Sequence, residues 1–141
     1  MNSLILYLAY GSNMEPVRMQ KRCPGARTLG AARLPNYRLT ERLYADIDFA
    51  EGENVDGVLY LITDRHLRSL DACEGYPKIY RRMWLEVEFN GESYTALTYE
   101  MTAETKAQRN GQKYPDEYRK LCSIGAKFHK VKNAFARKKK K

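Results

Sequence analysis

The stretch LILYLAYGSNME, residues 4–15, places a continuous apolar run directly before Tyr-Gly-Ser-Asn. An apolar run of this length is typical of a buried strand. The segment MEPVRMQKRC, residues 14–23, is predicted to form a short helix with Pro16 near its start. Gly11 lets the backbone turn between them, so that successive N–H groups point the same way and can bind a carboxylate or phosphate. The alternative is an ordinary turn in which Asn13 caps the helix.

Further strands are predicted from the pattern of apolar residues. Two strand segments are expected within residues 27–39, separated at Pro35-Asn36. Residues 43–50 alternate Leu, Ala, Ile and Phe with polar residues and predict a half-buried strand, and the turn-rich EGEN separates it from a strand at 54–63. Asn90-Gly91 lies between two alternating runs in residues 82–101, which predicts a β-hairpin.

Two more helices are predicted. The first covers residues 63–75, with Thr63 or Asp64 as its N-cap and Gly75 as its C-terminal stop. The second opens at Pro115 and presents an apolar stripe, while the polar segment between it and the hairpin is expected to be a loop. The stripe consists of Leu121, Ile124 and Phe128.

The order of these elements is strand, helix, several strands, helix, hairpin, helix. Strands and helices do not alternate regularly, which excludes a doubly wound parallel sheet. The order favours an α+β domain in which a strongly curved or closed, mostly antiparallel sheet carries helices at its rim.

The charge is unevenly distributed along the 141 residues. The chain has a formal net charge of +8, and residues 127–141 hold eight basic and no acidic residues. Residues 1–126 are therefore formally neutral and are expected to form one domain, followed by a basic tail that is at least partly disordered. The alternative role for this tail is contact with nucleic acid or an anionic membrane surface.

The cysteines and the N-terminus suggest a cytoplasmic protein. Cys23, Cys73 and Cys122 are widely spaced and odd in number, which is a poor disulfide framework. The N-terminal apolar run is too short for a membrane span and has no basic start typical of a signal peptide. His66 and Cys73 are two helical turns apart, too far for nucleophile activation, and no metal or cofactor motif is present.

Glu74 is the candidate for acid/base chemistry. It falls at the end of a predicted helix, just before Gly75, where a surface helix prefers cations because its last carbonyls carry partial negative charge. A part-buried carboxyl in this position has a raised pKa, which suits a general acid/base near neutral pH. The alternative is an exposed glutamate that is tolerated at small cost.

Taken together, these motifs resemble those of the γ-glutamylcyclotransferase-like family. The resemblance rests on YLAYGSNM at 7–14, RCPGA at 22–26, VDGVLYLIT at 55–63, LDACEGYPKIYRR at 70–82 and PDEYRKLCSIGA at 115–126. The family fold is a small closed β-barrel with flanking helices. One departure is that Gly125-Ala126 runs into KFHKVK, where the family often has a Gly-Leu-Pro-type turn.

The resemblance implies an enzyme that cyclises the glutamyl part of a γ-glutamyl amine or peptide to 5-oxoproline and releases the amine or amino acid, without a metal or cofactor. It assigns the acid/base role to Glu74. It places the substrate against the N-terminal loop and two further tyrosines. These residues are Tyr7, Tyr10, Gly11, Ser12, Asn13, Tyr80 and Tyr118.

The resemblance leaves two questions open. The leaving group could be an amino acid, a cysteinyl-glycine portion, a polyamine or another amine. A non-enzymatic small-molecule-binding module of the same fold, associated with RNA or a membrane through its lysine tail, is the alternative function. The sequence does not indicate the oligomeric state.

Overall fold

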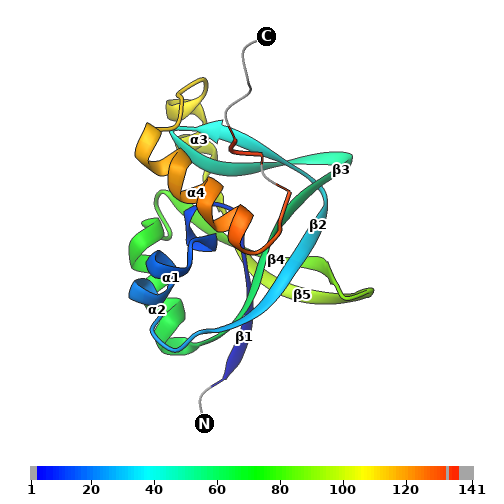
Figure 1. Cartoon of the computed structure of the whole chain (residues 1–141). Coiled ribbons are helices and arrows are strands. Elements are labelled where there is room, and N and C mark those ends of the chain that lie inside the picture. Colours follow the sequence, from blue (N-terminus) through cyan, green and yellow to red (C-terminus); the bar gives the residue numbers. More distant parts are fainter. Residues whose placement is uncertain (1–2, 133, 137–141) are drawn as a thin grey trace.

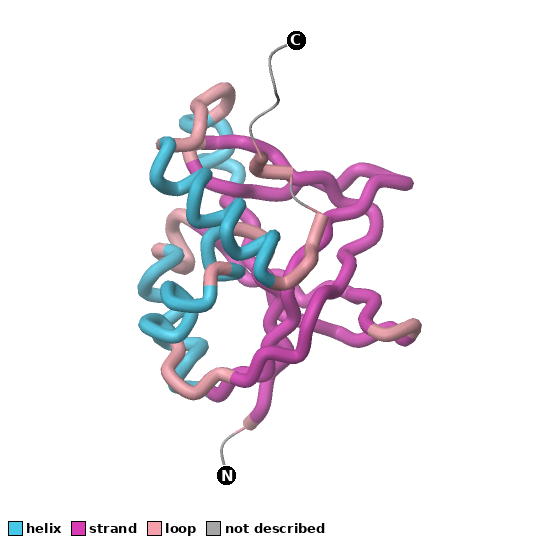
Figure 2. Tube along the Cα trace, in the orientation of Figure 1, coloured by secondary structure: helices cyan, strands magenta, loops and turns pink. Residues whose placement is uncertain are grey.

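The computed structural model describes residues 3–132 and 134–136, which form a closed five-stranded barrel flanked by helices (Figure 1). Figure 2 shows the helices gathered on one side of the strands. In chain order the elements are β1 (Leu4–Ala9), the 3-10 helix η1 (Ser12–Met14), α1 (Pro16–Arg22), β2 (Arg27–Arg42), β3 (Tyr44–Thr63), α2 (Asp64–Glu74), β4 (Tyr80–Phe89), β5 (Glu92–Met101), α3 (Ala103–Arg109) and α4 (Asp116–Phe128).

The barrel has the strand order β1-β3-β2-β4-β5. The pairs β1–β3, β2–β3, β2–β4 and β4–β5 are antiparallel. The barrel closes through a parallel pairing of β1 with β5, in which Tyr7 lies opposite Leu97. The predicted α+β class with a closed, mostly antiparallel sheet is thus confirmed.

The predicted break at Pro35-Asn36 and the predicted turn at EGEN are both wrong. β2 and β3 are each continuous, and they form one long hairpin with an irregular register between Pro35 and Tyr37. Asn36 and Gly52 have positive φ angles of 66° and 82°, and the Asn36 side chain accepts a hydrogen bond from the Gly52 N–H at 3.1 Å. These turn-type residues form a bulge within the hairpin, because a bulge absorbs extra residues without ending the strands.

The predicted alternation over residues 43–50 is wrong in its details. Asp46 is completely buried, whereas Phe49 is 68% exposed and packs edge-on against Tyr37. Asp46 can lie inside because Arg42 and Lys106 pair with its carboxylate, and a buried charge is tolerated when it is paired and hydrogen-bonded. The sequence pattern alone does not reveal these distant partners.

The predicted ends of α2 are confirmed. The Thr63 side chain accepts a hydrogen bond from the His66 N–H, and the His66 Nδ1 accepts one from the Thr63 N–H, which together form a capping box. Gly75 takes the left-handed conformation with φ 67°, which ends the helix. The predicted β4–β5 hairpin is also confirmed, and its turn is Asn90-Gly91, with both φ angles positive.

The predicted apolar stripe of α4 does not form the buried face of this helix. Ile124 and Phe128 are 47% and 66% exposed, and the buried face consists of Cys122, Gly125 and Ala126. Small residues are needed there because α4 packs closely on η1. A Cβ atom on Gly125 would lie 2.4 Å from the carbonyl carbon of Met14.

The segment expected to be a polar loop contains the helix α3. Its first turn is capped by Thr102, whose hydroxyl accepts a hydrogen bond from the Thr105 N–H. The helix was missed because its sequence is polar and short, so that it shows little hydrophobic periodicity.

The chain continues to contribute to the core beyond α4. Val131 and Phe135 are buried, and the Phe135 ring centroid lies 5.5 Å from that of Tyr114. Residues 137–141, which contain most of the lysine run of the expected tail, lie outside the described residues. Within the described part of the chain, no helix is long and apolar enough to cross a membrane.

Candidate functional site

A cavity of about 260 Å³ lies at the helix-covered end of β1, and η1, α1, α2, α3, α4 and the tip of the β2–β3 hairpin contribute to its walls. The structure brings all the residues implied by the family resemblance to this one cavity. They are Tyr7, Tyr10, Gly11, Ser12, Asn13, Glu74, Tyr80 and Tyr118.

Glu74 is the last residue of α2 and faces the cavity just before the left-handed Gly75. Burial raises the pKa of its carboxyl group from 4.5 to about 7, although Arg22 and Arg18 favour the ionised form. The residue is half-buried, because protein atoms surround the carboxyl while the cavity gives it access to small molecules. Across residues 3–132 and 134–136, no hydrogen bond or ion pair uses this carboxyl. A carboxyl with this pKa can both accept and donate a proton near pH 7.

Gly11 is required by close packing at the start of the loop. A Cβ atom at this position would lie 2.8 Å from the Tyr118 hydroxyl and 3.2 Å from the Ala45 Cβ. The N–H groups of Gly11 and Ser12 precede the first turn of η1, where a helix leaves its amides unpaired. No acceptor for either amide is found in the described part of the chain.

Asn13 does not cap the following helix, so the turn-and-cap alternative is wrong. The Glu15 carboxylate caps α1 by accepting hydrogen bonds from the N–H groups of Val17 at 2.6 Å and Arg18 at 3.2 Å. Asn13 belongs to η1, and Met14, the last residue of η1, lies between it and Glu15, so Asn13 is two positions too early in the chain to cap α1.

The Asn13 side chain instead connects β1 to α1. Its amide donates to the Tyr7 hydroxyl at 2.9 Å, and its carbonyl oxygen accepts from Arg22 at 2.9 Å. The backbone carbonyl of Asn13 accepts a hydrogen bond from Tyr60 at 2.9 Å. These three contacts fix the loop in one conformation and hold Tyr7 at the cavity wall.

Two tyrosines of the site hold the backbone of Ala45 at the tip of the hairpin. Tyr80 donates a hydrogen bond to the Ala45 carbonyl at 2.8 Å, and the Ala45 N–H donates to the Tyr118 hydroxyl at 3.1 Å. Burial raises the pKa of both tyrosines well above 10, so both hydroxyls stay protonated at neutral pH. The position of Ala45 therefore sets where these hydroxyls lie.

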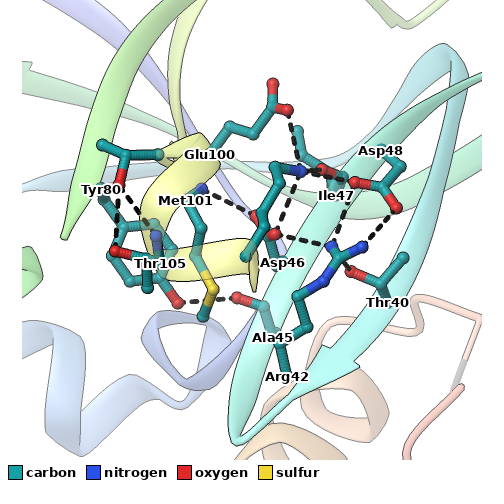
Figure 3. A network of polar contacts seen from close by, with 12 residues as sticks. Thr40, Arg42, Ala45, Asp46, Ile47, Asp48, Tyr80, Glu100, Met101 and Thr105 are labelled. Atoms are coloured by element: carbon teal, nitrogen blue, oxygen red, sulfur yellow. Dashed lines mark hydrogen bonds and ion pairs between the residues drawn. The ribbon is translucent and has the colours of Figure 1, made fainter. Parts of the chain in front are cut away.

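A buried network of charges fixes the hairpin next to Ala45 (Figure 3). The Asp46 carboxylate accepts from the Met101 N–H at 2.8 Å and pairs with Arg42 at 2.9 Å and Lys106 at 3.2 Å. Arg42 and Lys106 also bind Asp48 and lower the pKa of its carboxyl to about 2. Because each of these charges has a partner in the network, it can hold β3, β5 and α3 together.

Sequence reasoning missed several residues of the cavity wall, above all three arginines: Arg18 and Arg22 on α1 and Arg109 on α3. The first two are four residues apart on a helix that was predicted, so this spacing on one helix face was a usable signal. Arg109 lies in the helix that was expected to be a loop. The sequence contained no comparable signal for it.

Neither a nucleophile pair nor a metal cluster is found in this part of the molecule. Both ring nitrogens of His66 are occupied, one with the Thr63 N–H at 3.1 Å and the other with the Pro24 carbonyl at 2.6 Å. Cys73 lines the cavity without a histidine partner among the residues of its wall. The described residues contain no group of three or more His, Cys, Asp or Glu side chains that could hold a metal ion.

Comparison with known proteins agrees with this arrangement. Residues 7–120 match the family described as gamma-glutamyl cyclotransferase, AIG2-like. The human protein named gamma-glutamylcyclotransferase is 30% identical over 139 residues, and the match covers 86% of this chain and 70% of the human protein. The mouse protein of the same name is 31% identical over 136 residues with the same coverage. A solved structure named gamma-glutamyl cyclotransferase is 27% identical, with a TM-score of 0.76, and covers 92% of this chain and 82% of that chain. The chain therefore belongs to the gamma-glutamyl cyclotransferase, AIG2-like family.

Proposed function

We propose that the protein cyclises the glutamyl part of a γ-glutamyl compound to 5-oxoproline and releases the attached amine or amino acid. Membership of the family supports an enzyme of the cyclotransferase kind. The observation that carries the proposal is that Glu74, with a pKa of about 7, shares one cavity with the Tyr10–Asn13 loop. A binding module would not require a proton-transfer group at this position.

In the proposed reaction the substrate supplies its own nucleophile. The α-amine nitrogen attacks the γ-carbonyl carbon, a new C–N bond closes a five-membered ring, and the original amide C–N bond then breaks. Because both reacting groups belong to one molecule, correct folding of the glutamyl chain in the cavity provides much of the rate acceleration. This accounts for a site without a nucleophilic serine or cysteine.

Glu74 performs the two proton transfers in this scheme. Its carboxylate takes a proton from the attacking amine and returns it to the leaving nitrogen, which departs as a neutral amine. The glutamate is ionised again at the end of the cycle. A pKa close to the working pH makes both transfers favourable.

The loop binds the glutamyl group. The unpaired N–H groups of Gly11 and Ser12 hold the α-carboxylate of the substrate, and the nearby Arg18 and Arg22 favour an anion in this part of the cavity. Amides of the same loop are also suited to stabilise negative charge on the carbonyl oxygen during ring closure. Tyr7, held by Asn13, completes this wall.

The test is to incubate the protein with a panel of γ-glutamyl amino acids, peptides and amines and to measure 5-oxoproline. The Glu74→Gln variant is expected to bind substrate but to lose about 10²–10⁴-fold in turnover. Glu53→Gln, at an exposed position on β3, serves as the matched control. A Glu74→Gln protein that turns over a confirmed substrate like the wild type would show that the proton-transfer assignment is wrong.

A further inference from the structure

Arg109 brings an uncompensated positive charge to the cavity wall. Its guanidinium lies over the Tyr44 ring, 5.5 Å from the ring centroid, and the residue is half-buried. Several arginines outside the cavity have carboxylate partners, such as Arg119 with Glu41 at 3.1 Å. In the described part of the chain no carboxylate pairs with Arg109. A half-buried guanidinium without a partner is a binding group for an anion.

The position of Arg109 is set by the buried charge network. Lys106 and Arg109 are three residues apart on α3, so their side chains leave the helix on the same face. Lys106 forms ion pairs with Asp46, Asp48 and Glu100. The network therefore anchors the helix that carries Arg109, and a mobile surface arginine would not be fixed in this way.

The cavity has positive charge at two separate places. The positive charges of Arg18 and Arg22 act to lower the pKa of Glu74, whereas the charge of Arg109 acts to lower the pKa of Tyr80. Figure 1 shows α1 beside α2 and α3 at the other end of the helical layer. Glu74 is the only acidic side chain among the residues that line the cavity. A substrate that fills the cavity thus meets cations carried by two different helices, α1 and α3.

We propose that Arg109 binds a carboxylate on the leaving group, so that the substrates are γ-glutamyl amino acids or peptides and not γ-glutamyl amines. The inference rests on the proposed function, which places the glutamyl end beside the loop and Glu74. The leaving group then extends toward α3. A polyamine there would bring its positive charge against the Arg109 guanidinium, whereas the carboxylate of an amino acid would form a charge-assisted hydrogen bond with it.

Two compounds that differ by one carboxylate test the proposal: γ-glutamylalanine and γ-glutamylethylamide. The wild type is expected to prefer γ-glutamylalanine in kcat/KM by about 10–100-fold, the range for one hydrogen bond to a charged group. Arg109→Gln is expected to remove this preference by slowing the alanine compound alone, and Arg109→Lys to restore part of it. Arg65→Gln, at an exposed position on α2, is the control and leaves both rates unchanged.

The outcomes separate this inference from the proposed function. If both compounds yield 5-oxoproline equally well, or if Arg109→Gln slows both to the same extent, the assignment of Arg109 is overturned while the cyclisation stands. If neither compound yields 5-oxoproline, the proposed function fails. Calorimetric binding of the two compounds then tests whether Arg109 binds the carboxylate of the leaving group. Tighter binding of γ-glutamylalanine that depends on Arg109 supports this role, and equal or absent binding refutes it.

Discussion

Glu74→Gln should stabilise the folded protein at alkaline pH. Burial raises the pKa of this carboxyl from 4.5 to about 7, so ionised Glu74 is less favourable in the folded protein than in the unfolded chain. Each tenfold change in the ionisation equilibrium corresponds to about 1.4 kcal/mol, which gives an upper limit of about 3.5 kcal/mol for this pKa difference. Since the cavity admits water to a half-buried side chain, we expect a gain of about 1–3 kcal/mol for the neutral amide.

The sign of the pH dependence follows from proton binding. Between the unfolded value of 4.5 and the folded value of about 7, the folded protein binds more protons at Glu74 than the unfolded chain does. The contribution of Glu74 to stability is thus largest below the lower value and decreases as the pH rises through this range. The variant and the wild type should be almost equally stable near about pH 4 and should differ fully above about pH 8.

Urea unfolding at a series of pH values measures this difference. The free energy of unfolding is extrapolated to water for both proteins, and equal m-values show that the same surface is exposed in each. Glu53→Gln, which changes an exposed carboxylate, should give no comparable gain. A Glu74→Gln protein that is no more stable than the wild type above about pH 8 would refute the reasoning. An equal gain in the free energy of unfolding at acid and alkaline pH would also refute it, because such a gain would not arise from the ionisation of Glu74.

Three further predictions follow from the site and the core. Gly11→Val should abolish 5-oxoproline formation, because its side chain would collide with the Tyr118 hydroxyl 2.8 Å from the Cβ position, whereas Ser12→Ala should keep most of the rate; equal rates would contradict the loop assignment. For the wild type, kcat/KM should rise with pH through about 7 and then level off, as Glu74 becomes ionised; a flat profile would exclude it as the base. Phe135→Ala should lower the free energy of unfolding by about 3–5 kcal/mol, since Phe135 is 2% exposed, while removal of residues 137–141 should leave thermal unfolding unchanged.

Local signals were sufficient to predict much of the fold. Thr63 and Gly75 mark the two ends of α2, and Asn90-Gly91 marks the turn of a hairpin, because each of these residues acts on the backbone beside it. The apolar run of β1 likewise indicated a buried strand whatever its neighbours. The order of such elements was enough to indicate a strongly curved or closed, mostly antiparallel sheet.

The failures have a common physical cause, which is that a distant partner changes what a residue does. Asp46 looked like a solvent-facing residue of an alternating strand, but Lys106, sixty positions later, pairs with it in the interior. Gly125 looked like an unremarkable helix position, but the backbone at Met14 packs against it. No window of neighbouring residues contains this information.

The candidate site likewise contains residues that could be predicted from the sequence and residues whose role depends on distant partners. The resemblance pointed to eight residues that the structure brings to one cavity, and Glu74 could be singled out from its place at a helix end. The pairing of Tyr80 and Tyr118 with the backbone of Ala45 depends on a hairpin whose position no local pattern gives. Arg109 remained invisible because its helix is short and polar.

The parallel seam between β1 and β5 links the two ends of the barrel sequence. Tyr7 and Leu8 from one strand and Thr98 and Tyr99 from the other lie along the cavity, so its wall is incomplete until the seam has formed. Contacts between residues so distant in sequence require the closure of a long loop, which has an entropic cost. A small molecule that contacts both strands would therefore stabilise the pairing of β1 with β5. Its binding would shift the balance toward the closed barrel by mass action, and the substrate would stabilise the protein against unfolding by a free energy that grows with the logarithm of its concentration above Kd.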